Sequence, residues 1–160
     1  MSIKVGDRVP PVNFVKATPD GPQPVDSENF FKGRTVALFS VPGAFTPTCS
    51  ARHLPGFVEK AEELKAKGVD EIACTAVNDA FVLQAWSKSA EADGRVTMLA
   101  DGNGDFVRAV GLGLDASKFG MGQRGQRFSM VVEDGVVKQL NVEEPGAYSV
   151  SSAEHMLAQL

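Results

Sequence analysis

Two apolar runs, each followed by a segment with helical spacing, narrow the possible folds of this chain most sharply. The first run covers residues 35–41 and the second covers residues 71–77. Apolar residues from Leu54 to Leu64 follow the first run at helical spacing, and Pro55 is expected to interrupt that helix near its start. Continuous apolar strands joined by helices are typical of parallel sheets covered by helices. The sequence therefore predicts an α/β protein built from βαβ units.

A second helix is expected directly after the second run. It would begin at Asn78 or Asp79, and its apolar side would consist of Phe81, Val82, Ala85 and Trp86. A short strand at 96–99, a short helix at 105–110 and a glycine-rich loop at 111–125 are expected to follow.

The carboxyl-terminal part has an antiparallel character. Residues 128–132 and 136–140 are two strands joined by an Asp-Gly pair, which is a strong hairpin signal. Ser151-x-x-Glu154 predicts a capping box at the start of a closing helix. Together these elements predict a thioredoxin-like fold: a central mixed sheet flanked by helices, with an amino-terminal extension and a carboxyl-terminal helix. A flavodoxin-like sheet is the main alternative, but its parallel strands would not supply this hairpin.

Length and charge limit the classes of protein. A chain of 160 residues with 43% hydrophobic residues is predicted to form a single domain over residues 1–160. The net charge of −4 argues against general binding to nucleic acid or to anionic membranes. Residues 1–11 lack the apolar core of a secretion signal, and no later segment is long enough to span a bilayer. We therefore expect a cytoplasmic protein.

The chain has two cysteines with different surroundings. A permanent disulfide is not expected in a reducing cytosol, so both are interpreted as thiols. Cys74 lies within the second apolar run and is predicted to be buried, whereas Cys49 follows Thr46-Pro47-Thr48, a composition typical of a helix start. Of the two thiols, we expect only Cys49 to be chemically exposed.

The helix start at Cys49 favours an anion. Thr46 is a good N-cap and Pro47 a good first residue, which places Cys49 in the first turn. The unpaired amides and the helix dipole there would stabilise a thiolate. The alternative interpretation is a plain capped helix in which Cys49 is one more small buried residue.

A longer pattern decides between these interpretations. Pro42, Thr46 and Cys49 match the Pro-x-x-x-Thr-x-x-Cys signature of peroxiredoxins, and the continuation to Phe57 resembles the plant type II and peroxiredoxin-5 branch. The segments Val77-Asn78-Asp79-Ala80-Phe81 and Arg127-Phe128-Ser129-Met130-Val131-Val132 are also similar to that branch. The resemblance implies a thioredoxin fold and thiol-dependent reduction of hydrogen peroxide or alkyl hydroperoxides.

The resemblance also implies roles for individual residues. The catalytic set would be Cys49, Thr46, Arg127 and Pro42. Cys49 would be oxidised, the Thr46 hydroxyl would contact the peroxide, Arg127 would contact both the thiolate and the peroxide, and Pro42 would shield the site from water. Substrate contacts are expected from Thr48, Phe45 and Phe119. We expect neither a cofactor nor a metal. We do expect a homodimer.

An unperturbed thiol is already about 3% ionised at pH 7, so complete ionisation of Cys49 would gain only about 30-fold in rate. A more acidic thiol is also a weaker nucleophile. Most of any large acceleration must therefore come from positioning the O–O bond and from stabilising charge on the departing oxygen. Thr46 and Arg127 are suited to this task.

Peroxide would leave Cys49 as a sulfenic acid, which a second thiol must reduce. The region 148–152, where some animal members carry a resolving cysteine, contains none. Cys74 is the only internal candidate, and its strand-like surroundings imply that reaching Cys49 would require local unfolding. We therefore expect a one-cysteine cycle, in which glutathione, glutaredoxin or thioredoxin reduces Cys49 directly.

Other functions remain open at this point. His53 lies four residues after Cys49, so a cysteine hydrolase pair or a Cys/His metal site is conceivable, although a packing or surface role is favoured. A disulfide carrier is disfavoured because Thr46 stands where the first cysteine of Cys-x-x-Cys would be. A sensor that relays oxidation to a partner protein is the main alternative to an enzyme.

Overall fold

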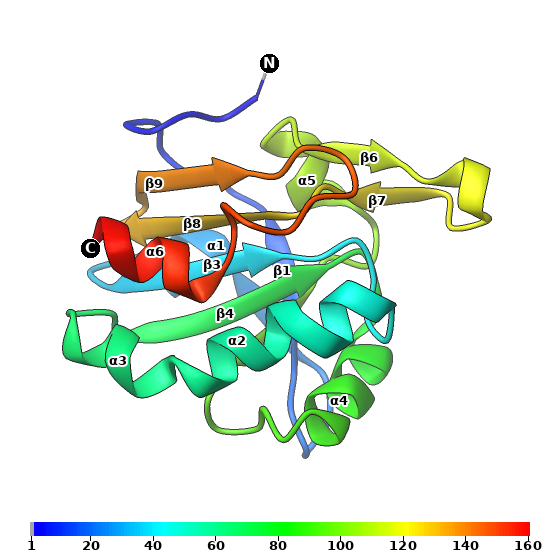
Figure 1. The fold of residues 1–160 in the computed structure, drawn as a ribbon, viewed down its shortest axis with the longest axis horizontal. Coiled ribbons are helices and arrows are strands. Elements are labelled where there is room, and N and C mark those ends of the chain that lie inside the picture. The colour runs from blue at the N-terminus through cyan, green and yellow to red at the C-terminus, as the bar shows by residue number, and fades with distance from the viewer. Residues whose placement is uncertain (1) are drawn as a thin grey trace.

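The computed structural model describes residues 2–160 and contains a seven-stranded sheet with the strand order β2-β1-β5-β4-β3-β8-β9 (Figure 1). The strands are β1 Asn13–Ala17, β2 Gln23–Asp26, β3 Thr35–Ser40, β4 Glu71–Ala76, β5 Thr97–Ala100, β8 Phe128–Glu133 and β9 Val136–Val142. Strands β3, β4 and β5 are parallel, whereas β8 pairs antiparallel with β3. The mixed, thioredoxin-like sheet is thus confirmed, and the antiparallel β8 beside β3 rules out the flavodoxin-like alternative.

Helices cover both faces of this sheet. They are α1 Ser27–Phe31, α2 Leu54–Glu59, α3 Ala61–Ala66, α4 Ala80–Ser89, α5 Asp105–Ala109 and α6 Ala153–Gln159. One apolar core contains Phe57 of α2, Trp86 of α4 and Met156 of α6, and the other contains Phe31 of α1 and Phe106 of α5. The burial of these side chains supplies the main driving force for packing the helices on the sheet.

The segment expected to be a glycine-rich loop is more regular than predicted. It contains β6 Gly113–Asp115, a 3₁₀ turn at Ser117–Phe119 and β7 Gln123–Gly125, and the two strands pair antiparallel. Figure 1 shows this hairpin extending away from the main sheet. Glycine has a low strand propensity, so the sequence concealed two short strands whose ends pair at Gly113 and Gly125.

Two details of the predicted helices are wrong. Helix α4 does begin after Asp79, whose carboxylate accepts from the amide of Val82 at 2.9 Å, but its buried face is centred on Leu83 and Trp86. Of the four residues predicted for the apolar side, Trp86 is buried as expected, whereas Phe81 is 72% exposed. Ala85 is exposed as well.

Helix α6 is capped one residue later than the capping box predicted. The hydroxyl of Ser152 accepts from the amide of His155 at 3.1 Å. Ser151 is fully buried, and its hydroxyl donates to Glu143 instead. The tertiary contact with Glu143 therefore overrides the local capping signal.

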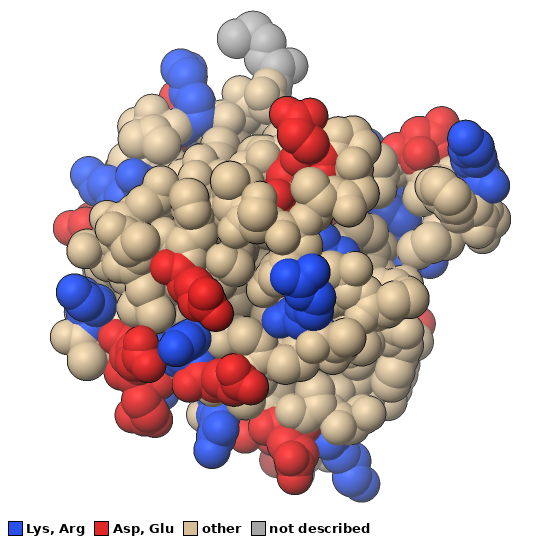
Figure 2. All heavy atoms as spheres, viewed as in Figure 1, with Lys and Arg blue, Asp and Glu red and all other residues tan. Residues whose placement is uncertain are grey.

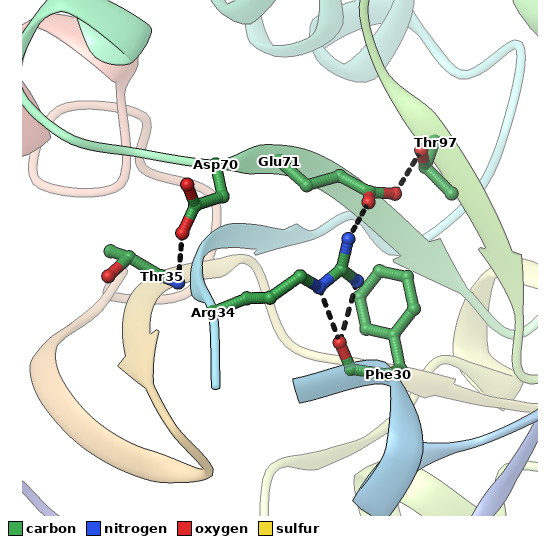
Figure 3. A network of polar contacts seen from close by, with 6 residues as sticks. All are labelled: Phe30, Arg34, Thr35, Asp70, Glu71 and Thr97. Atoms are coloured by element: carbon green, nitrogen blue, oxygen red, sulfur yellow. Dashed lines mark hydrogen bonds and ion pairs between the residues drawn. The ribbon is translucent and has the colours of Figure 1, made fainter. Parts of the chain in front are cut away.

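A polar network ties together the amino-terminal ends of the central parallel strands. Figure 3 shows its members: Phe30, Arg34, Thr35, Asp70, Glu71 and Thr97. The guanidinium of Arg34 donates to the carbonyl of Phe30 and pairs with Glu71, which also accepts from the hydroxyl of Thr97. These contacts hold the amino-terminal edge of the sheet and leave the carboxyl ends of β3 and β4, where α/β proteins usually bind ligands, for a site.

The visible surface has mixed charge. In Figure 2, lysine and arginine side chains alternate with aspartate and glutamate over this face, without a broad area of one sign. Over residues 2–160, no helix has both the length and the apolar character needed to cross a bilayer.

Candidate active site

The loop after β3 brings Cys49 to the carboxyl edge of the sheet. The amide of Val41 donates a hydrogen bond to the carbonyl of Thr75 at 3.2 Å, and the amide of Ala44 donates to the side-chain oxygen of Asn78 at 2.9 Å. Helical structure begins at residue 47, and a π-helical turn spans Cys49–His53. In this wide turn the amide of Leu54 donates to the carbonyl of Cys49. The predicted interruption near Pro55 is thus confirmed, because a proline in the second position of α2 has no N–H to donate to the preceding turn.

Thr46 occupies the capping position, but its side chain does not cap the helix. Its carbonyl accepts from the amide of Ser50 at 2.9 Å, as expected of an N-cap residue. Its hydroxyl, however, donates to the carbonyl of Gly43 at 2.7 Å. The prediction of a side-chain cap is therefore wrong, and the hydroxyl lone pairs are oriented by a bond within the loop.

The topology of the sheet brings Arg127 to Cys49 across 78 residues of sequence. Phe128 opens β8 and pairs with Ser40 at the end of β3, so Arg127 lies beside the loop that follows β3. Its Nη2 donates to Sγ of Cys49 at 3.1 Å. This contact places a positively charged group directly against the sulfur.

Cys49 is fully buried, which corrects the expectation of an exposed thiol. The apolar side of its helix packs against the sheet, so the first turn lies under the surface. The two cysteines therefore differ in the polarity of their surroundings and not in exposure. Both belong to one apolar core, but the Arg127 guanidinium contacts the sulfur of Cys49.

His53 contacts Arg127, a contact that the sequence did not predict. It is fully buried, its Nε2 lies 3.0 Å from the carbonyl of Ser151, and its Nδ1 lies 2.9 Å from Nη1 of Arg127. Burial and the neighbouring positive charge of Arg127 lower the pKa of His53 to about 3. Its spacing of four residues from Cys49 was the available signal, but the partner Arg127 lies on a distant strand.

Neither chemical alternative for His53 fits this geometry. Both ring nitrogens are engaged, one with a backbone carbonyl and one with a guanidinium, so the ring has no free position for a metal ion or for a proton from Cys49. Among residues 2–160, no group of three His, Cys, Asp or Glu side chains is arranged to hold a metal ion.

Comparison with known proteins gives the family. Residues 4–157 match the Redoxin family model. The chain is 51% identical to peroxiredoxin-2E-2, chloroplastic, of Oryza sativa subsp. japonica, over 99% of this chain and 73% of that protein. It is 47% identical to peroxiredoxin-2B of Arabidopsis thaliana, over 99% and 98% of the two chains. The chain belongs to the peroxiredoxin family.

A solved structure supports the same assignment. Reduced Prx3 of Vibrio vulnificus in complex with hydrogen peroxide is 46% identical, covers 98% of each chain and superposes with a TM-score of 0.94. The relatives named peroxiredoxin-2 indicate the type II branch, as the sequence motif predicted. The protein is accordingly a peroxidase that depends on a thiol.

The second thiol of this peroxiredoxin lies in a different setting. Cys74 pairs in register with Phe39 in the middle of the sheet and is fully buried, and burial raises the pKa of its thiol well above the usual value. It belongs to the same apolar core as Cys49. The prediction of a buried strand position is confirmed.

The remaining predicted residues occupy two regions of the peroxiredoxin. Pro42 and Thr48 are half-buried in the segment that precedes Cys49. Phe45 is 52% exposed and has a φ angle of 64°, a left-handed conformation that is uncommon for a residue with a side chain. Phe119 is 76% exposed and lies in the β6–β7 hairpin.

Proposed function

We propose that the Cys49 thiolate attacks the terminal oxygen of hydrogen peroxide or of an alkyl hydroperoxide. The sulfur–oxygen bond forms as the oxygen–oxygen bond breaks, and Cys49 becomes a sulfenic acid. The departing oxygen takes a proton and leaves as water or an alcohol. The observation that carries this proposal is the 3.1 Å contact between Nη2 of Arg127 and Sγ of Cys49.

The surrounding groups suit the developing charge. Arg127 is close enough to Sγ to contact an oxygen bound beside it, and so to stabilise the negative charge of the leaving oxygen. Because the Thr46 hydroxyl donates to Gly43, its lone pairs are free to accept from the O–H of the peroxide. The amides of Thr48 and Cys49 lie in the first helical turn and add donors. Pro42 is proposed to limit water, and Phe45 and Phe119 to contact the organic part of larger hydroperoxides.

The reductant is proposed to be external. The chain has only two cysteines, and Cys74 is fixed within β4 and held in its thiol form by burial. A one-cysteine cycle follows, in which glutathione with glutaredoxin, or thioredoxin, attacks the oxidised sulfur of Cys49. No cofactor or metal takes part in this cycle.

We also propose a homodimer that acts in a reducing compartment such as the cytoplasm. One chain leaves the aromatic side chains of Phe45, Phe81 and Phe119 exposed, and aromatic side chains are enriched at interfaces between proteins. Sedimentation of the reduced protein at micromolar concentration tests the dimer, and a monomer would contradict it.

Steady-state removal of peroxide tests the cycle. Glutathione with glutaredoxin is compared with thioredoxin and its reductase, using wild type, Cys49→Ser and Cys74→Ser. We expect many turnovers with at least one reductant for wild type and Cys74→Ser, and none for Cys49→Ser. Loss of turnover in Cys74→Ser with every reductant would contradict the one-cysteine cycle, and oxidation limited to one equivalent per chain would instead favour a peroxide sensor.

A further inference from the structure

A buried carboxylate is linked to the Arg127 guanidinium through Ser151 and His53 and has no part in the chemistry proposed above. Glu143 follows β9 and is only 6% exposed. One of its oxygens accepts from the amide of Ser149 at 2.7 Å, from the amide of Ser151 at 2.8 Å and from the hydroxyl of Ser151 at 2.6 Å. Burial alone would raise its pKa, but these hydrogen bonds outweigh burial and hold the pKa of Glu143 below its usual value. The carboxylate therefore anchors the segment 149–151.

The same residue also contacts Arg127 through its backbone. The amide of Glu143 donates to the carbonyl of Arg127 at 3.0 Å. Glu143 thus links two segments, the strand entry that carries Arg127 and the loop that carries Ser151.

His53 joins the other ends of these two segments. The carbonyl of Ser151 can only accept, so Nε2 of His53 must donate to it and must carry the ring proton. Nδ1 is then an acceptor, which matches the donating Nη1 of Arg127. The ring plane is held by neighbouring aromatic rings, with centroid distances of 4.8 Å to Phe39 and 5.2 Å to Tyr148. With Nη1 held by the imidazole, Nη2 faces the sulfur of Cys49.

We propose that His53 and Glu143 are positioning residues that hold the Arg127 guanidinium toward Cys49. Glu143 fixes the Ser151 carbonyl, that carbonyl selects the tautomer of His53, and His53 orients Arg127. The inference rests on the proposed role of Arg127 at the peroxide. It adds that this role depends on a neutral imidazole and on a carboxylate that never touches the substrate.

Two substitutions of His53 separate positioning from packing. Glutamine has an amide that can donate to Ser151 and accept from Arg127, whereas leucine fills space and can do neither. In a Cys74→Ser background, we expect His53→Leu to lower the rate constant for peroxide by about 10- to 100-fold at a pH where the Cys49 thiol is ionised. His53→Gln should stay within several-fold of the parent protein. Equal losses in the two variants would overturn the proposal.

Substitution of Glu143 tests the more distant link. Glu143→Ala should lower the same rate constant, and Glu143→Gln, which keeps an accepting oxygen, should lower it less. Because both residues act through Arg127, the loss in His53→Leu/Glu143→Ala should be clearly smaller than the product of the two single losses. Fully independent effects would contradict a chain of contacts.

Alkylation by iodoacetamide serves as the matched control reaction. Alkylation needs the thiolate of Cys49 but no guanidinium directed at a leaving oxygen. In His53→Leu, the rate constant for alkylation should therefore fall by much less than the rate constant for peroxide. If wild-type Cys49 reacts with peroxide no faster than free cysteine, the proposed function fails. If wild type is fast and His53→Leu is equally fast, only the positioning role fails.

The wild-type protein offers a test that no unfolded variant can obscure. Nitrogen-15 NMR of the imidazoles should find His53 neutral, with the proton on Nε2, from pH 5 to pH 9. A proton on Nδ1, or titration near pH 6.5, would overturn the proposal even if every variant of His53 failed to fold.

Discussion

Arg127 places a positive charge 3.1 Å from the Cys49 sulfur, and we propose that it accelerates the peroxide reaction by more than ionisation of the thiol can. Ionising an ordinary thiol completely at pH 7 gains only about 30-fold, since about 3% is already thiolate. A donor directed at a developing oxyanion is worth about 10²- to 10³-fold. The geometry therefore assigns most of the acceleration due to Arg127 to the departing oxygen.

Arg127→Ala tests this assignment. At a pH where the thiol of the variant is fully ionised, as followed by thiolate absorbance, the peroxide rate constant should still be lower by about 100-fold or more. Stopped-flow mixing measures it, and Trp86 is a convenient fluorophore because its indole donates to the hydroxyl of Ser50 at 2.9 Å, next to Cys49. A near-normal rate under these conditions would refute the assignment.

His53 makes the stability of the fold sensitive to acid. Its pKa is about 3 in the folded protein, below the usual value near 6.5 in an unfolded chain. The unfolded chain binds the proton more readily. The contribution of neutral His53 to the free energy of unfolding is therefore fully present above about pH 6.5, and it falls as the pH drops toward 3, by roughly 1.4 kcal/mol per pH unit.

Urea unfolding between pH 7.5 and pH 4.5 measures this dependence. In His53→Gln the side chain at position 53 no longer titrates. The free energy of unfolding of this variant should therefore fall less steeply with falling pH than that of wild type. Parallel curves for the two proteins would show that His53 is not held neutral by the fold.

Among the single residues of the site, local patterns predicted those of one motif, and the family resemblance added Arg127. Pro42, Thr46 and Cys49 lie within eight positions of one another, and their types and spacing identify the helix start. The partners of His53 and the burial of Cys49 depend on β8 and on the loop near Ser151, which local patterns do not reveal. The hydroxyl of Thr46 was expected to accept from an amide of the first helical turn, as an N-cap does, but it donates to the carbonyl of Gly43 in the loop instead.

At the level of elements, the β6–β7 hairpin packs closely against the core at one glycine. A Cβ on Gly125 would lie 2.7 Å from Cγ1 of Val107 and 3.1 Å from Oγ of Ser40. A Cβ on Gly113, its partner in the pair, would meet only the carbonyl oxygen of Arg124 at 3.9 Å. The two ends of one hairpin therefore differ in their tolerance of a side chain.

Gly125→Ala should destabilise the fold by about 1–3 kcal/mol, because Val107 must shift to make room. The melting temperature should fall by several degrees. Gly113→Ala is the matched control and should melt within about a degree of wild type. Equal melting temperatures for the two variants would contradict the close approach at Gly125.

The elements that the sequence predicted well are those with a strong period or a clear turn. The runs that became β3 and β4 are continuous and apolar, and the β8–β9 turn carries Asp134 and Gly135 with φ angles of 49° and 83°, as its Asp-Gly pair indicated. Helix α4 was found, but only Trp86 of its predicted buried face is buried, because apolar residues occur around most of the helix circumference. Tertiary packing, which the period does not encode, selected Leu83 and Trp86.

At the scale of the whole molecule, the order of strands creates the site. The parallel pair β3 and β4 and the antiparallel β8 bring the residues after β3 and the residue before β8 to one edge of the sheet. The sequence predicted the fold class because both the parallel units and the late hairpin leave signals. The contact of Arg127 with Cys49 across that edge was implied only by the family resemblance, since local patterns do not join residues 78 positions apart.

We propose above that peroxide oxidises Cys49 at the site that Arg127 completes. The most direct test of this proposal adds one equivalent of hydrogen peroxide to the reduced protein, traps sulfenic acid with dimedone and locates the adduct by mass spectrometry. Wild type and Cys74→Ser should carry the adduct on Cys49 within the mixing time, and Cys49→Ser should carry none. An adduct that forms equally fast on Cys74, or peroxide consumption undiminished in Cys49→Ser, would contradict it.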